Sequence, residues 1–432
     1  MRIRRLLSAA CVFAAFAASG GDGALDSWLR GLYGRVDYET YALVDRAART
    51  LEANALGRRL QRKLPEGEFA THALEPPAWA PLRAIQPSER HFVGFWNWDG
   101  AFAAVGASWF DPELARDQFR VLRRLQRADG FLGDVLGVDG RVLSNWGKPP
   151  VAAWAFAVVH RRCPDRAFLA ETYPFLKRHV LSYDRVRRCA NGLYRYDADN
   201  APDEATHRKW AGWESGWDNS PRWDGNAWNV CAVDLNCWLV LADRALAAFA
   251  EELGLAADAA DWKRRETELA SRVERELWDA EAGCYYDWNW ASNRFSRILT
   301  PASFMPLFAG IASREHAARM AAVATRLSPG WPSVSYDDPA FDPLQYWRGR
   351  TWINIAYFAI RGLKDYGFDD IADRGRARLL EMLRGDGSSI YENYHPVTGV
   401  PLGVPRFSWS CAFALELALD WARTKEPTGG AQ

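Results

Sequence analysis

The sequence predicts an all-α protein whose helices form an (α/α)6 barrel, a toroid of six inner and six outer helices. Beyond about residue 40, helical patterns alternate with loops rich in glycine, proline, asparagine, aspartate and tryptophan, and convincing strand patterns are scarce. Six amphipathic segments interleave with six segments that carry fewer charges. Two concentric rings satisfy this arrangement, because inner helices are covered on both faces and outer helices bury only one stripe.

The outer helices are predicted from caps and apolar stripes. Asp111 and Pro112 supply an N-cap and a first-turn proline for a helix that ends near Gly130. Trp262 and Leu269 belong to the apolar stripe of a second helix. The other amphipathic segments lie near residues 42–62, 165–182, 313–327 and 369–384.

The inner helices are predicted where the aromatic loops end. They start near Asp99, Pro149, Asn226, Pro301, Arg350 and Ser408. Because every aromatic loop lies N-terminal to a less charged helix, all six loops are expected to converge at one mouth of the barrel. That mouth is the candidate site, and the uneven spacing of the starts argues against a solenoid of short repeats.

One folded domain is expected between residues 25 and 424. Residues 1–20 have the pattern of a secretory signal peptide, with a basic start and an apolar run, so we expect a secreted or periplasmic protein. The run is too short for a stable bilayer anchor, which predicts no membrane attachment after signal removal; a buried first helix is the alternative. Residues 425–432 are polar and glycine-rich, which is typical of a disordered tail.

The composition favours a neutral or small ligand. The 432 residues include 54 basic and 54 acidic side chains, so the chain has no excess of positive charge of the kind that binds nucleic acid. The 22 tryptophans exceed what a core requires, although packing remains the alternative for any one of them. No cofactor is expected.

Seven cysteines are present, of which Cys11 lies in the predicted signal. No short cysteine pair and no His/Asp/Glu cluster has the spacing of metal ligands, so no metal site is predicted, although the sequence leaves a bound calcium ion open. Cys163 and Cys189 are the candidates for a disulfide in an oxidising compartment, with buried free thiols as the alternative.

The most informative stretch is residues 213–224, in which three carboxylates and three tryptophans surround turn-forming residues. Indole faces and carboxylates together suit the C–H faces and the hydroxyls of a sugar. Three further loops share this character, at residues 95–102, 346–354 and 391–396. We therefore predict a carbohydrate site.

Two carboxyl groups in these loops are candidates for chemistry. Glycoside hydrolysis needs one carboxyl to protonate the leaving oxygen and a second to act as nucleophile or base, and we assign these roles to Asp218 and Glu392. Local sequence leaves alternatives open. Asp218 and Glu214 could cap turns, and Asp99 could cap the helix that starts at Gly100. Glu392 could instead form an ion pair with an arginine.

The four loops together resemble glycoside hydrolase family 63, which includes processing α-glucosidases and small bacterial mannosylglycerate and glucosylglycerate hydrolases. Trehalases of family 37 are similar at a greater distance. The resemblance covers most of residues 90–420 in the same order, and the string Glu-Ser-Gly-x-Asp-Asn-Ser-Pro-Arg-Trp-Asp is its most specific part. It implies an (α/α)6 barrel, in agreement with the helix pattern.

The resemblance also implies roles for individual residues. Asp218 corresponds to the general acid and Glu392 to the general base of an inverting reaction, with water held between Glu392 and the anomeric carbon. A protonated Asp218 near neutral pH requires a raised pKa, which burial beside Trp213 and Trp217 would supply. The candidate substrate-binding residues are Trp96, Trp98, Asp99, Lys148, Trp213, Glu214, Trp217, Arg222, Tyr346, Trp347, Arg348, Tyr394 and Trp409.

Two departures from the family pattern limit the prediction of the substrate. Lys148 precedes Pro149 where small members that act on glyceryl glycosides tend to carry glutamine, and Arg350 stands where proline commonly follows Trp-Arg-Gly. Lys148 could contact an acidic aglycone such as glycerate or face solvent. The extra β-rich domain of large processing glucosidases is missing, which favours a compact sugar.

The sequence thus predicts an exported α-glycosidase that hydrolyses a small α-glucoside or α-mannoside, with a small carbohydrate as its partner. A sugar epimerase or isomerase would need histidine bases, and only His395 of the seven histidines lies in an aromatic loop. A non-catalytic carbohydrate-binding barrel, the third alternative, would keep the tryptophans and lack one of the two carboxyls.

Overall fold

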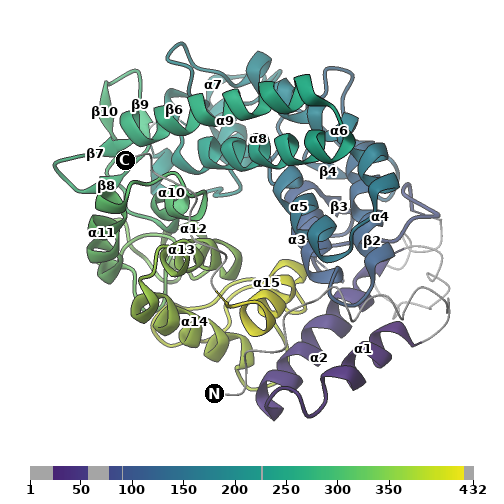
Figure 1. Cartoon of the computed structure of the whole chain (residues 1–432). Helices are drawn as coiled ribbons and strands as arrows, with labels where there is room; N and C mark the ends of the chain where they lie inside the picture. Colours follow the sequence, from purple (N-terminus) through teal and green to yellow (C-terminus); the bar gives the residue numbers. More distant parts are fainter. Residues whose placement is uncertain (1–22, 57–76, 90, 225–226, 423–432) are drawn as a thin grey trace.

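The computed structural model describes residues 23–56, 77–89, 91–224 and 227–422, and its helices follow one another around a ring (Figure 1). The inner helices are α3 (Asn97–Ala107), α5 (Ala152–Arg162), α8 (Val233–Leu253), α10 (Met305–Phe308), α13 (Ile353–Asp365) and α15 (Ser408–Leu419). The outer helices are α2 (Tyr38–Ala53), α4 (Pro112–Leu122), α6 (Arg166–Val186), α9 (Ala256–Glu276), α11 (Arg314–Val323) and α14 (Asp369–Arg384). The predicted all-α (α/α)6 barrel is confirmed.

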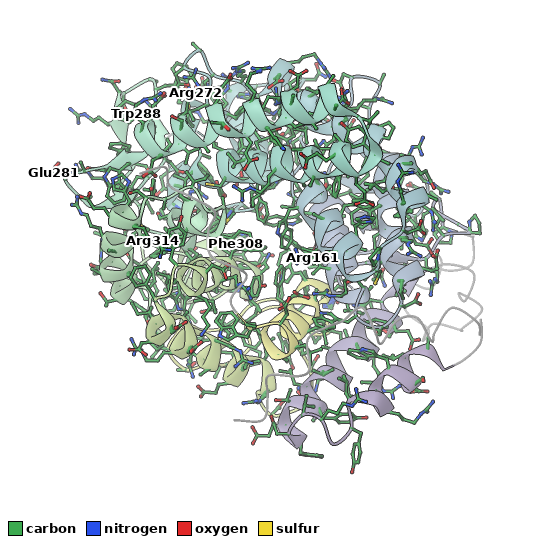
Figure 2. All side chains as sticks on the ribbon, viewed as in Figure 1. Arg161, Arg272, Glu281, Trp288, Phe308 and Arg314 are labelled. Atoms are coloured by element: carbon green, nitrogen blue, oxygen red, sulfur yellow. The ribbon has the colours of Figure 1, made fainter. Side chains whose placement is uncertain are left out.

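The two rings differ in burial as their sequences predict. Every residue of α3 is buried, whereas α9 buries only the stripe that includes Trp262 and Leu269. The ring closes where α15 packs against α2 and α3. Figure 2 shows Phe308 toward the inside of the ring and Arg272 and Glu281 on its outside. No helix within the described ranges is long and apolar enough to cross a membrane.

Most predicted helix starts agree with the structure within a few residues, and α8 is the exception. Its start was expected near Asn226 and lies at Val233. Between them, Ala227–Asn229 form a 3-10 turn and Val230–Cys231 form strand β6, which pairs with β9 (Trp288–Asn289). The predicted signal and tail, like the last residues of the helix expected over 42–62, lie outside the described residues.

In the described ranges, three further α-helices and short strands lie outside the two rings. The additional helices are α1 (Ala24–Leu32), α7 (Glu204–Glu214) and α12 (Tyr346–Gly349). The other strands are β1 (Ala55–Leu56), β2 (Ala84–Ile85), β3 (Phe95–Trp96), β4 (Val135–Leu136), β5 (Val142–Leu143), β7 (Trp278–Asp279), β8 (Cys284–Tyr285) and β10 (Arg294–Phe295). All pairings among these strands are antiparallel.

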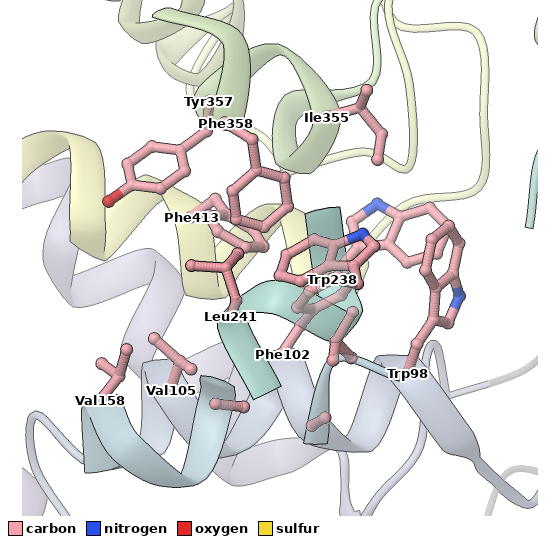
Figure 3. Close-up of a cluster of buried hydrophobic side chains, with 14 of the residues drawn as sticks. Trp98, Phe102, Val105, Val158, Trp238, Leu241, Ile355, Tyr357, Phe358 and Phe413 are labelled. Carbon is pink, nitrogen blue, oxygen red and sulfur yellow. The ribbon is translucent and has the colours of Figure 1, made fainter. Parts of the chain in front are cut away.

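Aromatic side chains from the inner helices fill the middle of the barrel (Figure 3). Phe358 of α13 contacts Phe102 of α3, Trp238 of α8 and Phe413 of α15, with ring centroids 5.0–5.9 Å apart. Trp98 lies against Phe102 at 5.5 Å and connects this core to the loops above it. The barrel is therefore packed inside, and its mouth is the place to look for a ligand site.

Candidate active site

A cavity of about 420 Å³, including its open mouth, lies at the N-terminal ends of the inner helices. It is lined by Pro87, Phe92, Trp96, Trp98, Asp99, Lys148, Gly216, Asp218, Tyr346, Trp347, Glu392, Phe407 and Trp409. Five of the six aromatic loops contribute to it. The loop before Pro301 does not line this cavity: its strand β9 pairs with β6 on one side and with β10 on the other.

Asp218 projects from the turn that follows α7. Gly216 makes this turn with φ +75°, and a Cβ there would lie 2.3 Å from the Trp98 ring, so the position requires glycine. The Asp218 side chain is open to solvent through the cavity, but protein surrounds it on most sides. This burial raises its pKa to about 6, against the opposing charge of Lys148.

Glu392 lies across the same cavity and is tightly held. The Tyr346 hydroxyl donates to Glu392 Oε1, and the Val404 amide donates to Oε2 at 3.4 Å. Trp409 and Ser410 donate to the Glu392 carbonyl oxygen, each at 3.3 Å. Burial raises the pKa of Glu392 to about 7, and the two hydrogen bonds to its carboxylate oppose that rise.

A third carboxyl, Asp99, lies in the first turn of α3 and lines the cavity. Burial raises its pKa well above the usual value, against the attraction of Lys148. Lys148 is itself buried: its Nζ donates to the Trp213 carbonyl at 2.5 Å and lies 3.4 Å from Asp134 Oδ2. The solvent-facing alternative for Lys148 is therefore wrong, and internal partners hold its ammonium group.

Glu214, a predicted substrate contact, is fully buried outside the cavity lining. It accepts from Arg187 Nε at 2.6 Å and from Arg187 Nη2 at 2.7 Å. The amides of Gly147 and Asp197 also donate to it, at 3.0 and 3.2 Å. Glu214 therefore ties α7 to the loop that carries Lys148 and supports the site from behind.

Arg222 is likewise a buried framework residue. Its guanidinium group donates two hydrogen bonds to the Asp234 carboxylate in α8 and two to the Asp287 carboxylate, at distances from 2.7 to 3.1 Å. The guanidinium that was predicted to contact a sugar is thus neutralised by two carboxylates inside the protein. These ion pairs anchor the end of the Asp218 motif to the start of α8.

Four other predicted contacts also lie outside the cavity lining. Trp213 packs on Trp146, and Trp217 packs behind Trp347. Arg348 forms a two-bond ion pair with Asp224. The Tyr394 hydroxyl accepts from a backbone amide, that of Tyr391. Sequence reasoning missed Pro87, Phe92, Gly216 and Phe407; of these, Gly216 was within the motif, and Phe92 and Phe407 adjoin predicted aromatic loops.

Neither the cysteines nor the acidic residues form a metal centre in the described part of the chain, where no group of three potential ligands is found. The six cysteines described are free. The suggested pairing of Cys163 with Cys189 is wrong, because Cys163 Sγ donates to the Ser108 carbonyl at 3.3 Å and Cys189 Sγ lies beside Cys231.

Comparison with known proteins identifies this architecture. Residues 93–410 match the family model of the mannosylglycerate hydrolase MGH1-like glycoside hydrolase domain. The chain belongs to glycoside hydrolase family 63. It is accordingly a glycoside hydrolase, and the epimerase and non-catalytic alternatives are set aside.

Curated relatives include two bacterial enzymes. The chain is 28% identical to a mannosylglycerate hydrolase of Thermus thermophilus over 76% of this chain and 94% of the relative. It is 25% identical to a mannosylglycerate hydrolase of Rubrobacter radiotolerans, with coverage of 78% and 93%.

Solved structures show the same barrel. A family 63 mannosylglycerate hydrolase from Thermus thermophilus, solved in complex with glucose, matches with a TM-score of 0.70 and 26% identity, over 87% of this chain and 99% of that one. The same enzyme with Tris and D-glycerate matches with a TM-score of 0.68 and 26% identity, over 86% and 99%. Neutral trehalase from Saccharomyces cerevisiae shares the fold, with a TM-score of 0.64, 20% identity and coverage of 79% and 74%.

Proposed function

We propose that this family 63 enzyme hydrolyses a small α-mannoside or α-glucoside with inversion, Asp218 acting as general acid and Glu392 as general base. The observation that carries the proposal is the placement of both carboxyls in the lining of one cavity, each with a pKa raised toward neutrality by burial. A raised pKa is what lets a carboxyl hold a proton for a leaving group near pH 7.

The mechanism follows from these two groups. Asp218 gives its proton to the glycosidic oxygen as the bond to the anomeric carbon breaks. Glu392 accepts a proton from a water molecule, whose oxygen attacks the anomeric carbon from the opposite face. An inverting pair needs room for that water, so we expect the carboxyls to stand roughly 6.5–9.5 Å apart in the substrate complex.

The rest of the lining suits the sugar ring. The indoles of Trp96, Trp98 and Trp409 offer flat apolar faces to its C–H groups, and Asp99 offers acceptors to its hydroxyls. Lys148 lies close enough to Asp99 and Asp218 to oppose the rise of both pKa values. A lining of this composition can hold a neutral pyranose by stacking and by hydrogen bonds.

The relatives support the choice of substrate. The Thermus and Rubrobacter relatives are mannosylglycerate hydrolases, and the solved Thermus enzyme holds glucose in one complex and D-glycerate in another. We therefore place mannosylglycerate and glucosylglycerate first in a panel that also contains trehalose and simple α-mannosides and α-glucosides. Release of mannose or glucose from at least one member supports the proposal; no release from any member, with saturable binding to one, would overturn it.

The raised pKa values predict a bell-shaped dependence of kcat/KM on pH. Glu392 must be ionised and Asp218 protonated, so activity falls as pH drops through one pKa and as pH rises through the other. The pKa is about 6 for the acid Asp218 and about 7 for the base Glu392, so the form with Asp218 protonated and Glu392 ionised is the less populated of the two singly protonated forms. Its population still peaks between these two pH values, and the maximum of kcat/KM is expected there. Initial rates measured across the acid, neutral and alkaline range test this, and a rate still climbing at the alkaline end would contradict it.

Tyr346→Phe should leave less of Glu392 in the ionised form that accepts the proton from water. The Tyr346 hydroxyl donates to the Glu392 carboxylate and holds its pKa down, so its loss should raise that pKa. Because the Glu392 pKa is the higher of the two, the alkaline limb of the pH profile should move upward, and the fraction of enzyme in the productive form should fall. A hydrogen bond to a charged group contributes about 1.5–3 kcal/mol, which corresponds to a loss of roughly 10-fold to 100-fold in kcat/KM.

Tyr336→Phe is the matched control for this substitution, because Tyr336 lies outside the cavity lining and its hydroxyl contacts the Gly330 backbone. Its pH profile should match that of the unaltered enzyme. Equal effects of the two substitutions on the alkaline limb would argue against a specific role for Tyr346.

A further inference from the structure

Two buried cysteines from distant parts of the chain meet behind the active-site loops. The sulfur atoms of Cys189 and Cys231 lie 3.1 Å apart, although the residues are separated by 42 positions. Cys189 is 9% exposed and Cys231 is fully buried. Cys163 and Cys284, by contrast, direct their thiols at backbone carbonyls.

The backbone on both sides of this pair is fixed by hydrogen bonds. The Cys189 amide donates to the Leu193 carbonyl at 2.7 Å and closes a tight turn. The strand that leaves this turn forms a bridge between Arg195 and Cys231, and β6 continues that contact into β9. The two sulfurs are therefore held together by three adjoining backbone segments rather than by a chance rotamer of one loop.

The charges around the pair favour reaction. The Cys231 thiol donates to the Cys189 sulfur and lowers the pKa of Cys189, and the Arg195 guanidinium lowers it further. The same hydrogen bond and burial raise the pKa of Cys231. A stabilised thiolate beside a protonated thiol is the arrangement from which thiol–disulfide exchange proceeds.

We propose that Cys189 and Cys231 form a disulfide that locks the framework of the active site. With a small-molecule disulfide such as oxidised glutathione as oxidant, the Cys189 thiolate attacks one glutathione sulfur and releases the other as a thiolate. Cys231 then loses its proton, attacks the Cys189 sulfur and releases the second glutathione. Two protein thiols are oxidised and one glutathione disulfide is reduced to two thiols.

The cross-link would stiffen the support of Asp218. Arg187 precedes Cys189 and Asp197 follows the hairpin, and both hold Glu214. Cys231 lies just before α8, whose Asp234 holds Arg222. A covalent bond between these segments also restricts the unfolded chain, and closing a loop of this length is expected to raise the melting temperature by about 4 °C or more.

Oxidation of the full-length enzyme tests the proposed disulfide directly. One sample is incubated with oxidised glutathione just below its unfolding transition and another with dithiothreitol; both are then alkylated, digested and analysed by mass spectrometry. We expect a peptide pair joined through Cys189 and Cys231, two fewer titratable thiols, a higher melting temperature and an unchanged initial rate in the oxidised sample. Full alkylation of both cysteines after oxidation, or equal melting temperatures, would overturn the proposal.

Variants separate this pair from the other thiols. Cys231→Ser should abolish the difference between oxidised and reduced samples, and Cys163→Ser, at a thiol beside the Ser108 carbonyl, should keep it. If Cys231→Ser fails to fold, the comparison of the two samples of unaltered enzyme still decides the matter. A temperature difference that persists in a folded Cys231→Ser enzyme would also overturn the proposal.

Discussion

Asp218→Asn and Glu392→Gln are each expected to lower kcat at least about 10³-fold, because each removes a proton-transfer group from the reaction. Both amides preserve the shape of the side chain in the cavity lining. Steady-state rates on the best substrate of the panel measure the effect. Asp224→Asn is the matched control: it lies in the same motif, but its partner is Arg348 at the surface, and its rate should stay within a few-fold of the unaltered enzyme.

Stability measurements distinguish lost chemistry from lost folding in these variants. Glu392 has a folded-state pKa of about 7 against an ordinary value of 4.5, so the unfolded state releases its proton first and stability falls as pH rises between the two. Glutamine does not ionise, so Glu392→Gln avoids this loss of stability. Glu392→Gln should therefore be more stable than the unaltered enzyme at about pH 8, by up to about 3 kcal/mol, and similar to it at about pH 4. An inactive variant that is also less stable under the alkaline condition would point to misfolding.

Glu214→Ala is expected to lower the free energy of unfolding by about 3–5 kcal/mol, because it leaves the buried Arg187 guanidinium without its two-bond partner. Urea denaturation followed by circular dichroism measures the change. Glu204→Ala on the same helix α7 is the control, since Glu204 forms an exposed ion pair with Arg208 and should cost no more than about 0.5 kcal/mol.

The stability of Glu214→Ala, taken together with its KM, also decides between two roles for Glu214. A stability loss below about 1 kcal/mol, combined with a large rise in KM, would restore the sequence-based prediction that Glu214 binds substrate. A large stability loss with an unchanged KM in the folded fraction supports the framework role.

Sequence patterns predicted the barrel because helix caps and burial stripes are local signals. Asp111 and Pro112 mark the start of α4, and the charge-poor segment after Arg350 became α13. The start of α8 was displaced because the strand pairing of Val230–Cys231 with a segment nearly sixty residues later has no local signal. Short strands of this kind depend on contacts that form only after folding.

The site was predicted as a set of loops more reliably than as individual contacts. Trp98, Asp99 and Trp409 line the cavity because they begin inner helices whose N-termini meet there. Glu214 and Arg222 do not, because their partners lie elsewhere in the chain. A motif alone cannot distinguish a carboxylate that faces a cavity from one neutralised by a distant arginine.

The most direct test of the proposed mechanism is the configuration of the sugar at the moment of release. Proton NMR of the reaction, recorded within the first minutes on the best α-mannoside or α-glucoside of the panel, reports the anomeric proton of the product before mutarotation. Hydrolysis between Asp218 and Glu392 predicts that the β-anomer appears first and then equilibrates. The α-anomer appearing first would show retention and would contradict the assignment of Glu392 as a base acting on water.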